Sequence, residues 1–337
     1  MRLKRLLDFL RNEPWAITHE RLAAIEALME LTARGVTMSA EDIRARIGEV
    51  PRSDSSKRGS IAVIPLHGVI SHRAGGLNEY SGGISTERFA GYFRQALGDA
   101  SVRAIVMDVD SPGGTIAGVT ELHQEIMAAR GKKPIVAHVN ALCASAGYWI
   151  ASAADEIWST PSGTVGSIGV ITSHLDASKA EESEGFTRTV ISAGKHKAEG
   201  FGPLTDDSLG YLQGRVDEAY GAMVADIASG RGRRPAEIRD GFGEGRVVSA
   251  TSAKRMGMID RIATFDQAID RLSQRRASSR MAAEAGDAEQ IAEAPTTTET
   301  LVEADGDDHL LGVVVRGVVD TAEDERDNEL RERLERG

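Results

Sequence analysis

The sequence has a single cysteine, Cys143, and few aromatic residues. One cysteine excludes an intramolecular disulfide framework and a metal site built from cysteines alone. Because Phe, Trp and Tyr make up only 4% of the chain, the core must be mostly aliphatic side chains and alanine. No segment reaches the roughly 18–20 apolar residues of a membrane span. The basic start at Met1 is interrupted by Asp8 and Glu13, unlike a signal peptide. We therefore expect a cytoplasmic protein without a membrane anchor.

Negative charge is concentrated at the C-terminal end. The chain carries a net charge of −11, and residues 281–337 contain 17 Asp and Glu against five Arg. The rest of the chain is therefore near neutral, which excludes a general nucleic-acid-binding surface. After Arg276 the composition shifts to Ala, Glu, Asp and Thr, which predicts a flexible acidic tail over residues 276–337. An apolar run at 310–319 interrupts this tail and resembles a strand.

Three regions precede the tail. Residues 1–50 predict an N-terminal helical arm, because Leu22, Ile25, Leu28 and Leu31 recur at three-residue intervals. Residues 51–59 are polar and rich in turn formers, as in a linker. Residues 60–275 alternate predicted strands and helices, which favours an α/β domain with crossover connections. The expected strands are 60–70, 102–109, 134–139, 156–159 and 168–172, and the expected helices are 86–97, 116–129, 148–155, 205–230, 235–239, 250–257 and 264–275.

Ser145 lies in the most informative stretch, Asn140-Ala-Leu-Cys-Ala-Ser-Ala-Gly-Tyr-Trp149. A small-residue turn between a strand and a helix can lift one serine hydroxyl clear of the backbone. The helix start also places free N–H groups near that hydroxyl. This is the geometry that the nucleophile of an acyl transfer needs. A lone serine in such a turn is more often structural. The other residues of the site therefore decide whether Ser145 is catalytic.

A second turn, Asp110-Ser-Pro-Gly-Gly114, ends another buried strand. Its two glycines allow the backbone to approach a ligand closely with free N–H groups. Such donors stabilise the negative charge on a carbonyl under attack, although an ordinary strand-to-helix turn is an equal alternative. Asp108 and Asp110 are interpreted as anchors of this turn through backbone hydrogen bonds.

Four blocks occur in the order seen in the signal peptide peptidase A (SppA) serine peptidases, and residues 60–275 resemble that family. The blocks are Asp-Ser-Pro-Gly-Gly, Ala-Ser-Ala-Gly-Tyr-Trp, Gly166-Ser-Ile-Gly-Val170 and Ala193-Gly-Lys-His-Lys197. The N-terminal helices and acidic tail are more similar to the phage and prophage branch, the head-maturation or capsid assembly proteases. The resemblance implies a Clp-protease/crotonase-like spiral of βαβ units, assembled into a ring-shaped homo-oligomer that encloses its active sites.

The resemblance also implies a role for five residues. Ser145 would be the nucleophile, Lys197 the general base, and Ser167 a hydrogen-bond partner of that lysine. The N–H groups of Gly113 and Ala146 would form the oxyanion hole. Ala146 replaces a glycine usual in the family, but the backbone donor survives the change. A free lysine has a pKa of about 10.4 and a base near neutral pH needs about 7–8, so Lys197 is expected to be enclosed.

Other residues offer alternatives. Lys195 competes with Lys197 as the base. A Ser-His-Asp arrangement using His174 and Asp176 is the rival mechanism. His196 is expected to be a loop residue, and Cys143 to be buried packing rather than a nucleophile. His67 and His138 are expected to be core or rim residues. No metal cluster is expected, and no cofactor.

The expected function is a serine endopeptidase with a Ser-Lys dyad that processes scaffold and capsid proteins during phage head assembly. Its location would then be the host cytoplasm or the assembling procapsid. The acidic tail would serve as a docking extension or a target of self-cleavage. One alternative is a cytosolic SppA-type peptidase that degrades signal peptides or membrane-protein fragments. Another is a catalytically silent assembly scaffold.

Overall fold

The computed structural model describes residues 14–33, 36, 38–47, 54–73, 83–176 and 178–274. The chain divides into two compact units, Met1–Glu284 and Ala285–Gly337, and every described residue belongs to the first. The predicted acidic tail at 276–337, with its strand-like run at 310–319, lies outside the described residues. No helix in the described part of the chain has the length and apolar character needed to cross a membrane.

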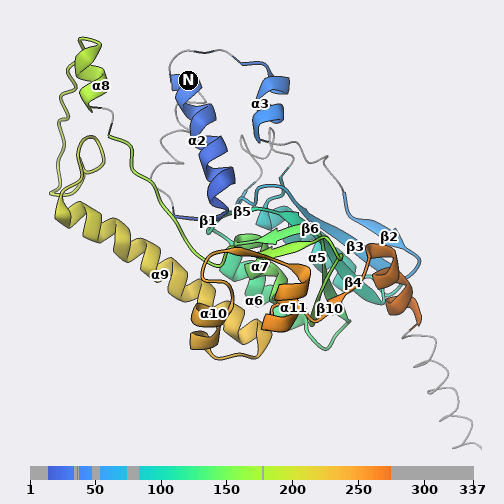
Figure 1. The fold of residues 1–337 in the computed structure, drawn as a ribbon. Coiled ribbons are helices and arrows are strands. Elements are labelled where there is room, and N and C mark those ends of the chain that lie inside the picture. Colours follow the sequence, from blue (N-terminus) through green and yellow to red (C-terminus); the bar gives the residue numbers. More distant parts are fainter. Residues whose placement is uncertain are drawn as a thin grey trace, which may run out of the picture. The chain divides into compact units, whose positions relative to one another are not determined.

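An eight-stranded sheet forms the centre of the described unit (Figure 1). Its main path has the order β10-β7-β6-β4-β3-β2, and β8 and β9 continue from β6. Neighbouring strands are parallel from β10 to β3, whereas β2 and β9 pair antiparallel. The strands are β2 (Ser56–Arg58), β3 (Ile61–His67), β4 (Ala104–Ser111), β6 (Ile135–Ala144), β7 (Glu156–Ser159), β8 (Thr164–Gly166), β9 (Val247–Ser249) and β10 (Arg261–Ile262).

Helices connect the parallel strands, as the alternating sequence pattern predicts. They are α5 (Thr86–Gly98), α6 (Val119–Ala129), α7 (Ala146–Ala151), α9 (Asp206–Arg231), α10 (Pro235–Gly241) and α11 (Ala250–Met256), with a further helix at 265–274. The Ser85 hydroxyl caps α5 and the Thr205 hydroxyl caps α9, each accepting from a backbone N–H of the first turn. The α/β class and most expected elements are therefore confirmed.

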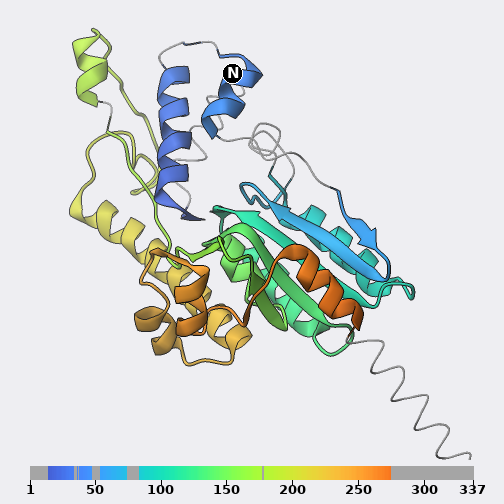
Figure 2. The ribbon, with the colours of Figure 1, turned by 45° about the vertical axis from the view of Figure 1, so that its right-hand side comes forward.

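The sheet is buried on both faces, because successive residues of β3 and β4 alternate between two apolar clusters. Ile64 and Met107 face the larger cluster, which α5, α6, α7 and α9 complete. Val63 and Val106 face the smaller cluster, which is closed by residues of the helix at 265–274. Figure 2 shows this last helix and the α5–α6 pair on opposite faces of the sheet.

The predicted N-terminal helical arm contains two helices, α2 (His19–Ala33) and α3 (Ala40–Ile47). It also contains a strand that the sequence analysis missed, β1 (Trp15–Ile17), which pairs with β5 (Gly113–Thr115). Part of the predicted linker forms the edge strand β2. The prediction of a strand at 168–172 was wrong. In that segment only Ile171 pairs, and it forms an isolated bridge with Trp15.

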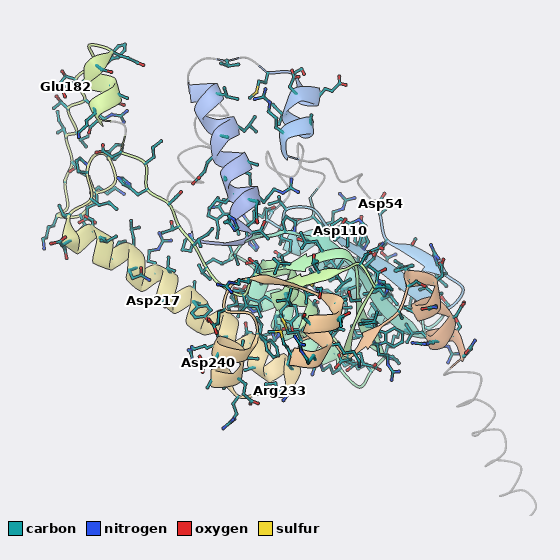
Figure 3. All side chains as sticks on the ribbon, viewed as in Figure 1. Asp54, Asp110, Glu182, Asp217, Arg233 and Asp240 are labelled. Carbon is teal, nitrogen blue, oxygen red and sulfur yellow. The ribbon has the colours of Figure 1, made fainter. Side chains whose placement is uncertain are left out.

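The chain between β8 and α9 runs away from the sheet to the short helix α8 (Ser178–Ser183) and returns to the start of α9 (Figures 1 and 2). We call residues 178–211 the outer segment. Figure 3 shows Glu182 on α8 and Asp217 on α9, well away from Asp110 at the end of β4. The outer segment exposes large apolar side chains, namely Phe186, Val190, Ile191, Phe201, Leu209 and Tyr211.

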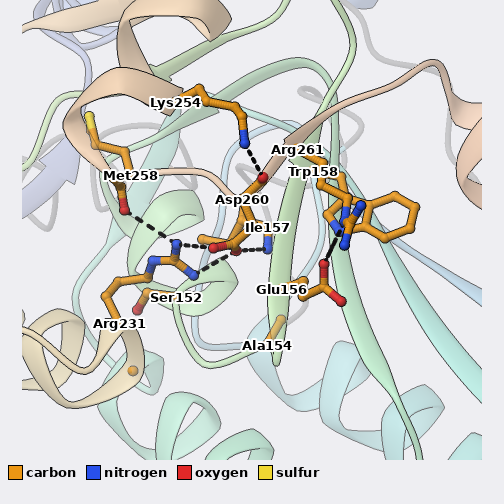
Figure 4. Close-up of polar contacts among 12 residues, drawn as sticks. Ser152, Ala154, Glu156, Ile157, Trp158, Arg231, Lys254, Met258, Asp260 and Arg261 are labelled. Carbon is orange, nitrogen blue, oxygen red and sulfur yellow. Dashed lines mark hydrogen bonds and ion pairs between the residues drawn. The ribbon is translucent and has the colours of Figure 1, made fainter.

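A partly buried ion pair holds the end of α9 against the sheet (Figure 4). Arg231 donates two hydrogen bonds, of 2.8 and 2.9 Å, to the two carboxylate oxygens of Asp260. The same carboxylate accepts from the Ile157 N–H of β7 at 2.7 Å. The Lys254 ammonium donates to the Asp260 carbonyl at 2.6 Å. These contacts join the end of α9 and the residues after α11 to β7.

Candidate active site

Ser145 sits at the end of β6, as the N-cap residue of α7, in an unusual backbone conformation. Its φ is 54° and its ψ is −119°. Non-glycine residues adopt positive φ rarely, at a cost of about 1–3 kcal/mol, and a serine held on a strained strand-to-helix turn is typical of a nucleophile. The Ser145 N–H donates to the Gly166 carbonyl at 2.8 Å. Its hydroxyl lies 3.4 Å from the Gly169 carbonyl oxygen.

Gly113 brings the two predicted turns together. A Cβ atom built on this glycine would lie 2.9 Å from the Ser145 Cβ and 3.1 Å from the Ala146 nitrogen. Gly113 also has a φ of 98°, which side chains disfavour. Because Ala146 opens α7, its N–H has no acceptor within the helix. The structure therefore places Gly113, Ser145 and Ala146 side by side, as the sequence analysis expected.

The Gly113 N–H is engaged inside its own turn. It donates to the Ser111 hydroxyl at 3.1 Å, and that hydroxyl donates to the Gly68 carbonyl at 2.7 Å. In this conformation the predicted oxyanion donor of Gly113 points at Ser111, and its catalytic role stays a prediction. Ser111 was not singled out from the sequence. Its buried position between the two turns explains why position 147 is glycine: a Cβ there would lie 3.2 Å from the Ser111 Cβ.

Ser167 follows Gly166, whose carbonyl accepts the hydrogen bond from the Ser145 N–H. Ser167 also has positive φ, at 53°, and its N–H donates to the Arg246 carbonyl at 2.9 Å. Gly166 cannot be replaced without rearrangement, because its φ is 131° and a Cβ would lie 2.3 Å from the same carbonyl oxygen. The Gly-Ser-Ile-Gly block thus forms one wall next to the nucleophile. The predicted bond from Ser167 to a lysine stays a prediction.

Lys197 lies on the outer segment, with its side chain exposed. Among the described residues, no hydrogen bond or ion pair links its amine to Ser145 or Ser167. Lys195 has a partner, since its ammonium lies 3.9 Å from an Asp207 carboxylate oxygen. The fold of one chain therefore does not supply the expected enclosure of Lys197, which stays a prediction for an assembly.

Three side chains on and next to the same loop could hold a cation. One ligand atom from each of His196, Glu199 and Asp207 lies within 4.8 Å of the other two. His196 contacts Glu199, and Asp207 also faces Lys195. All three are partly or fully solvent-accessible. The ion pairs account for the cluster, which fixes the loop to the start of α9.

The residues of the alternative mechanisms make contacts away from Ser145. His174 lies 2.9 Å from the Gly202 carbonyl oxygen, and Asp176 accepts from the Ser178 N–H. Cys143 is fully buried, and burial raises the pKa of its thiol, which keeps it protonated and unreactive. The Asp108 carboxylate contacts His67 at 3.1 Å and accepts from Asn140. Asp108 is thus anchored through side chains, whereas the sequence analysis expected backbone hydrogen bonds.

The sequence is similar to known proteins over the segment that contains Ser145. Peptidase family S49 matches residues 128–279, which include Ser145, Ser167 and Lys197. The chain is 31% identical over 258 residues to the capsid assembly protease C of Escherichia phage lambda, covering 75% of this chain and 56% of that protein. It is 31% identical over 211 residues to the head-tail preconnector protein GP5 of Enterobacteria phage P21, covering 62% and 42%. Protease 4 of Salmonella typhi is 30% identical over 221 residues, covering 63% and 34%.

The chain thus spans about half the length, or less, of these curated relatives. Among solved structures, a mutant ClpP1 from Listeria monocytogenes matches with a TM-score of 0.39 and 16% identity. That match covers 60% of this chain and 91% of ClpP1. Two of the three sequence relatives are named proteases, and the family match covers the segment that contains the strained serine. The chain therefore carries a domain of peptidase family S49.

Proposed function

We propose that the chain is a serine endopeptidase in which Ser145 is the nucleophile. The observation that carries the proposal is the Ser145 backbone, held at positive φ between a strand end and a helix start. The Ser145 side chain makes no capping hydrogen bond to α7, and strain of this kind is typical of functional sites and of nucleophilic serines. Membership of the S49 family supports the same assignment.

Peptide hydrolysis would proceed through an ester of Ser145. The hydroxyl oxygen attacks the peptide carbonyl carbon while an uncharged amine takes its proton, and the Ala146 N–H stabilises the resulting oxyanion. Collapse expels the leaving amine, which receives the proton back from the lysine. A water molecule then cleaves the ester in the same way. Lys197 is proposed as the amine, and Ser167 as its hydrogen-bond partner.

A lysine acts as a base only when it is uncharged, and burial away from water favours that form. Lys197 is exposed in the single chain, on an outer segment that also exposes Phe186, Ile191 and Phe201. Several exposed large apolar side chains on one segment favour an interface there. We propose that assembly of several copies brings Lys197 of one copy to Ser145 of another and encloses both.

The proposed substrates are scaffold and capsid proteins of a phage head. Two of the relatives support this choice, being named a capsid assembly protease and a head-tail preconnector protein. Confinement inside an assembly would restrict cleavage to extended segments that reach the interior. The proposed location follows from the substrates: the host cytoplasm or an assembling procapsid.

The test compares the wild-type chain with Ser145→Ala on candidate capsid and scaffold proteins, mapping new termini by mass spectrometry. Ser229→Ala is the matched control, because Ser229 is an exposed serine on α9, outside the outer segment. We expect cleavage by the wild type and by Ser229→Ala, and none by Ser145→Ala. Cleavage that survives in Ser145→Ala would mean that this serine is not the nucleophile.

A further inference from the structure

The strand β1 lies in a groove with main chain on both sides. On one side it pairs antiparallel with β5, in a register that places Ala16 opposite Gly114. On the other side Trp15 exchanges two backbone hydrogen bonds with Ile171, of 2.7 and 2.9 Å. The Thr18 N–H adds a bond of 3.0 Å to the Pro112 carbonyl. A strand bonded along both edges is held as a bound peptide is held in β-strand addition.

Ala16 is the residue of β1 that lies beside Gly113, and Gly113 lies beside Ser145. A Cβ atom built on Gly113 would lie 2.1 Å from the Ala16 carbonyl oxygen, and the same atom would be 2.9 Å from the Ser145 Cβ. The Ala146 nitrogen is 3.1 Å from that point. The main chain of Ala16 therefore runs directly beside Gly113, the residue that also lies next to Ser145 and Ala146.

The main chain of Ala16 is turned toward β5. Trp15 directs its N–H and C=O to Ile171, and these groups alternate in direction along a strand. Ala16 consequently directs its own N–H and C=O to β5, where Gly114 is its partner in register. Gly114 leaves no room for a side chain, because a Cβ there would lie 1.8 Å from the Ile70 carbonyl oxygen. The edge of the groove at Gly113 is open to main-chain pairing because this residue has no side chain, and a Cβ there would lie 2.1 Å from the Ala16 carbonyl oxygen.

The side chains of β1 divide between two environments. Ala16 is fully buried in the large apolar cluster that also contains Ala146 and Ile70. Trp15 and Ile17 face the other way and pack with Val69 and with Leu22 and Ile25 of α2. The position next to Ser145 therefore holds a small side chain, and its two neighbours are large and apolar.

We propose that the groove between β5 and Ile171 binds the main chain of an extended peptide, and that β1 occupies it as a tethered pseudosubstrate. The proposal rests on the proposed function only in taking Ser145 as the nucleophile. A peptide of the pattern large apolar, small, large apolar would bind when β1 leaves. Because only chains with an open groove can bind, occupation by β1 lowers the apparent affinity for such a peptide.

Binding can be measured without catalysis, in the Ser145→Ala background. The probe is a fluorescein-labelled peptide with the sequence of residues 12–19, Asn-Glu-Pro-Trp-Ala-Ile-Thr-His, followed by fluorescence anisotropy. Ala16→Pro removes the N–H that faces β5 and weakens β1 pairing. His19→Pro is the matched control, since His19 is exposed and begins α2, where proline is tolerated.

We expect Ala16→Pro to bind the peptide about fivefold tighter or more than the control, which corresponds to loss of about 1 kcal/mol from one hydrogen bond. A peptide with phenylalanine in place of the central alanine should not bind, because the Ala16 position is fully enclosed. Circular dichroism checks that Ala16→Pro is folded. If it is not, Trp15→Ala replaces it, since this change keeps the backbone of β1 and takes the Trp15 side chain out of its apolar cluster.

Hydrolysis of the same peptide by chains with Ser145 intact separates the two proposals. Faster hydrolysis by Ala16→Pro than by His19→Pro, together with tighter binding, supports both. Tighter binding, without hydrolysis of the peptide or of capsid and scaffold proteins by any variant with Ser145, keeps the occupied groove and overturns the peptidase function. Equal binding by Ala16→Pro, Trp15→Ala and the control overturns the occupied groove, whatever the rate of hydrolysis.

Discussion

Gly113 and Ser145 approach each other so closely that a Cβ atom on Gly113 would come within 2.9 Å of the Ser145 Cβ. The contact joins the start of β5, directly after β4, to the end of β6, and β4 and β6 are neighbouring parallel strands. Parallel strands end at one edge of a sheet, and sites of α/β proteins form there. The Gly113 position therefore controls the place of the nucleophile as well as the turn that it belongs to.

Gly113→Ala is expected to destabilise the chain by at least about 1–3 kcal/mol, because it combines positive φ with collisions against backbone. Gly91→Ala is the matched control. Gly91 lies in the exposed part of α5, with nothing within 4 Å of a new Cβ. That change should stabilise by about 0.5–1 kcal/mol. Urea unfolding measures both, and equal stability of the two variants would contradict the geometry.

The ion pair of Arg231 and Asp260 gives a second prediction. Asp260→Ala leaves the guanidinium of Arg231, whose side chain is 7% exposed, without its carboxylate. It also removes the acceptor of the Ile157 N–H. We expect a loss of about 3 kcal/mol in the free energy of unfolding. Asp266→Ala breaks the exposed pair with Arg58 and should cost no more than about 1 kcal/mol.

Local structure determines the parts of the site that can be predicted from the sequence. A strand, a small-residue turn and a helix are all encoded within residues 134–151, so the positions of Ser145 and Ala146 follow from the local pattern. Gly113 can be placed in the same way, at the end of the preceding buried strand. That these turns meet follows from the parallel pairing of β4 with β6. The sequence pattern implies this pairing without its register.

The remaining parts depend on partners distant in the sequence. Trp15, Ala16 and Ile17 are all apolar, and three such residues are too few to distinguish a strand from a helix start. Only β5 and Ile171 make them a strand. The place of Lys197 could not be predicted either, because ion pairs with Asp207, at the start of α9, hold its loop.

Shared active sites predict complementation between two inactive chains. Ser145→Ala lacks the nucleophile and Lys197→Met lacks the proposed base, and each should be inactive alone. If Lys197 of one copy serves Ser145 of another, co-assembly of equal amounts restores about a quarter of the wild-type rate, since random neighbours complete that share of sites. Lys195→Met should retain activity. An active Lys197→Met chain would exclude this lysine as the base.

Burial of His123 predicts a specific dependence of stability on pH. Its side chain is buried in α6, and neither ring nitrogen has a hydrogen-bond partner within the described structure. Burial lowers the pKa of this histidine below its ordinary value; nearby Asp226 opposes the shift and Arg130 adds to it. The unfolded chain therefore binds a proton at a higher pH than the folded chain does. The free energy of unfolding should consequently decrease as the pH falls below about 6.5.

His123→Leu removes this titration while filling the same apolar space on α6. The decrease in stability below about pH 6.5 should become shallower by up to about 1.4 kcal/mol per pH unit, the value for one proton. Some slope will remain, because burial also lowers the pKa of His138. Urea unfolding at a series of pH values measures the difference. Parallel curves for the two proteins would mean that His123 takes up its proton equally in the folded and unfolded chains, which its unpartnered nitrogens argue against.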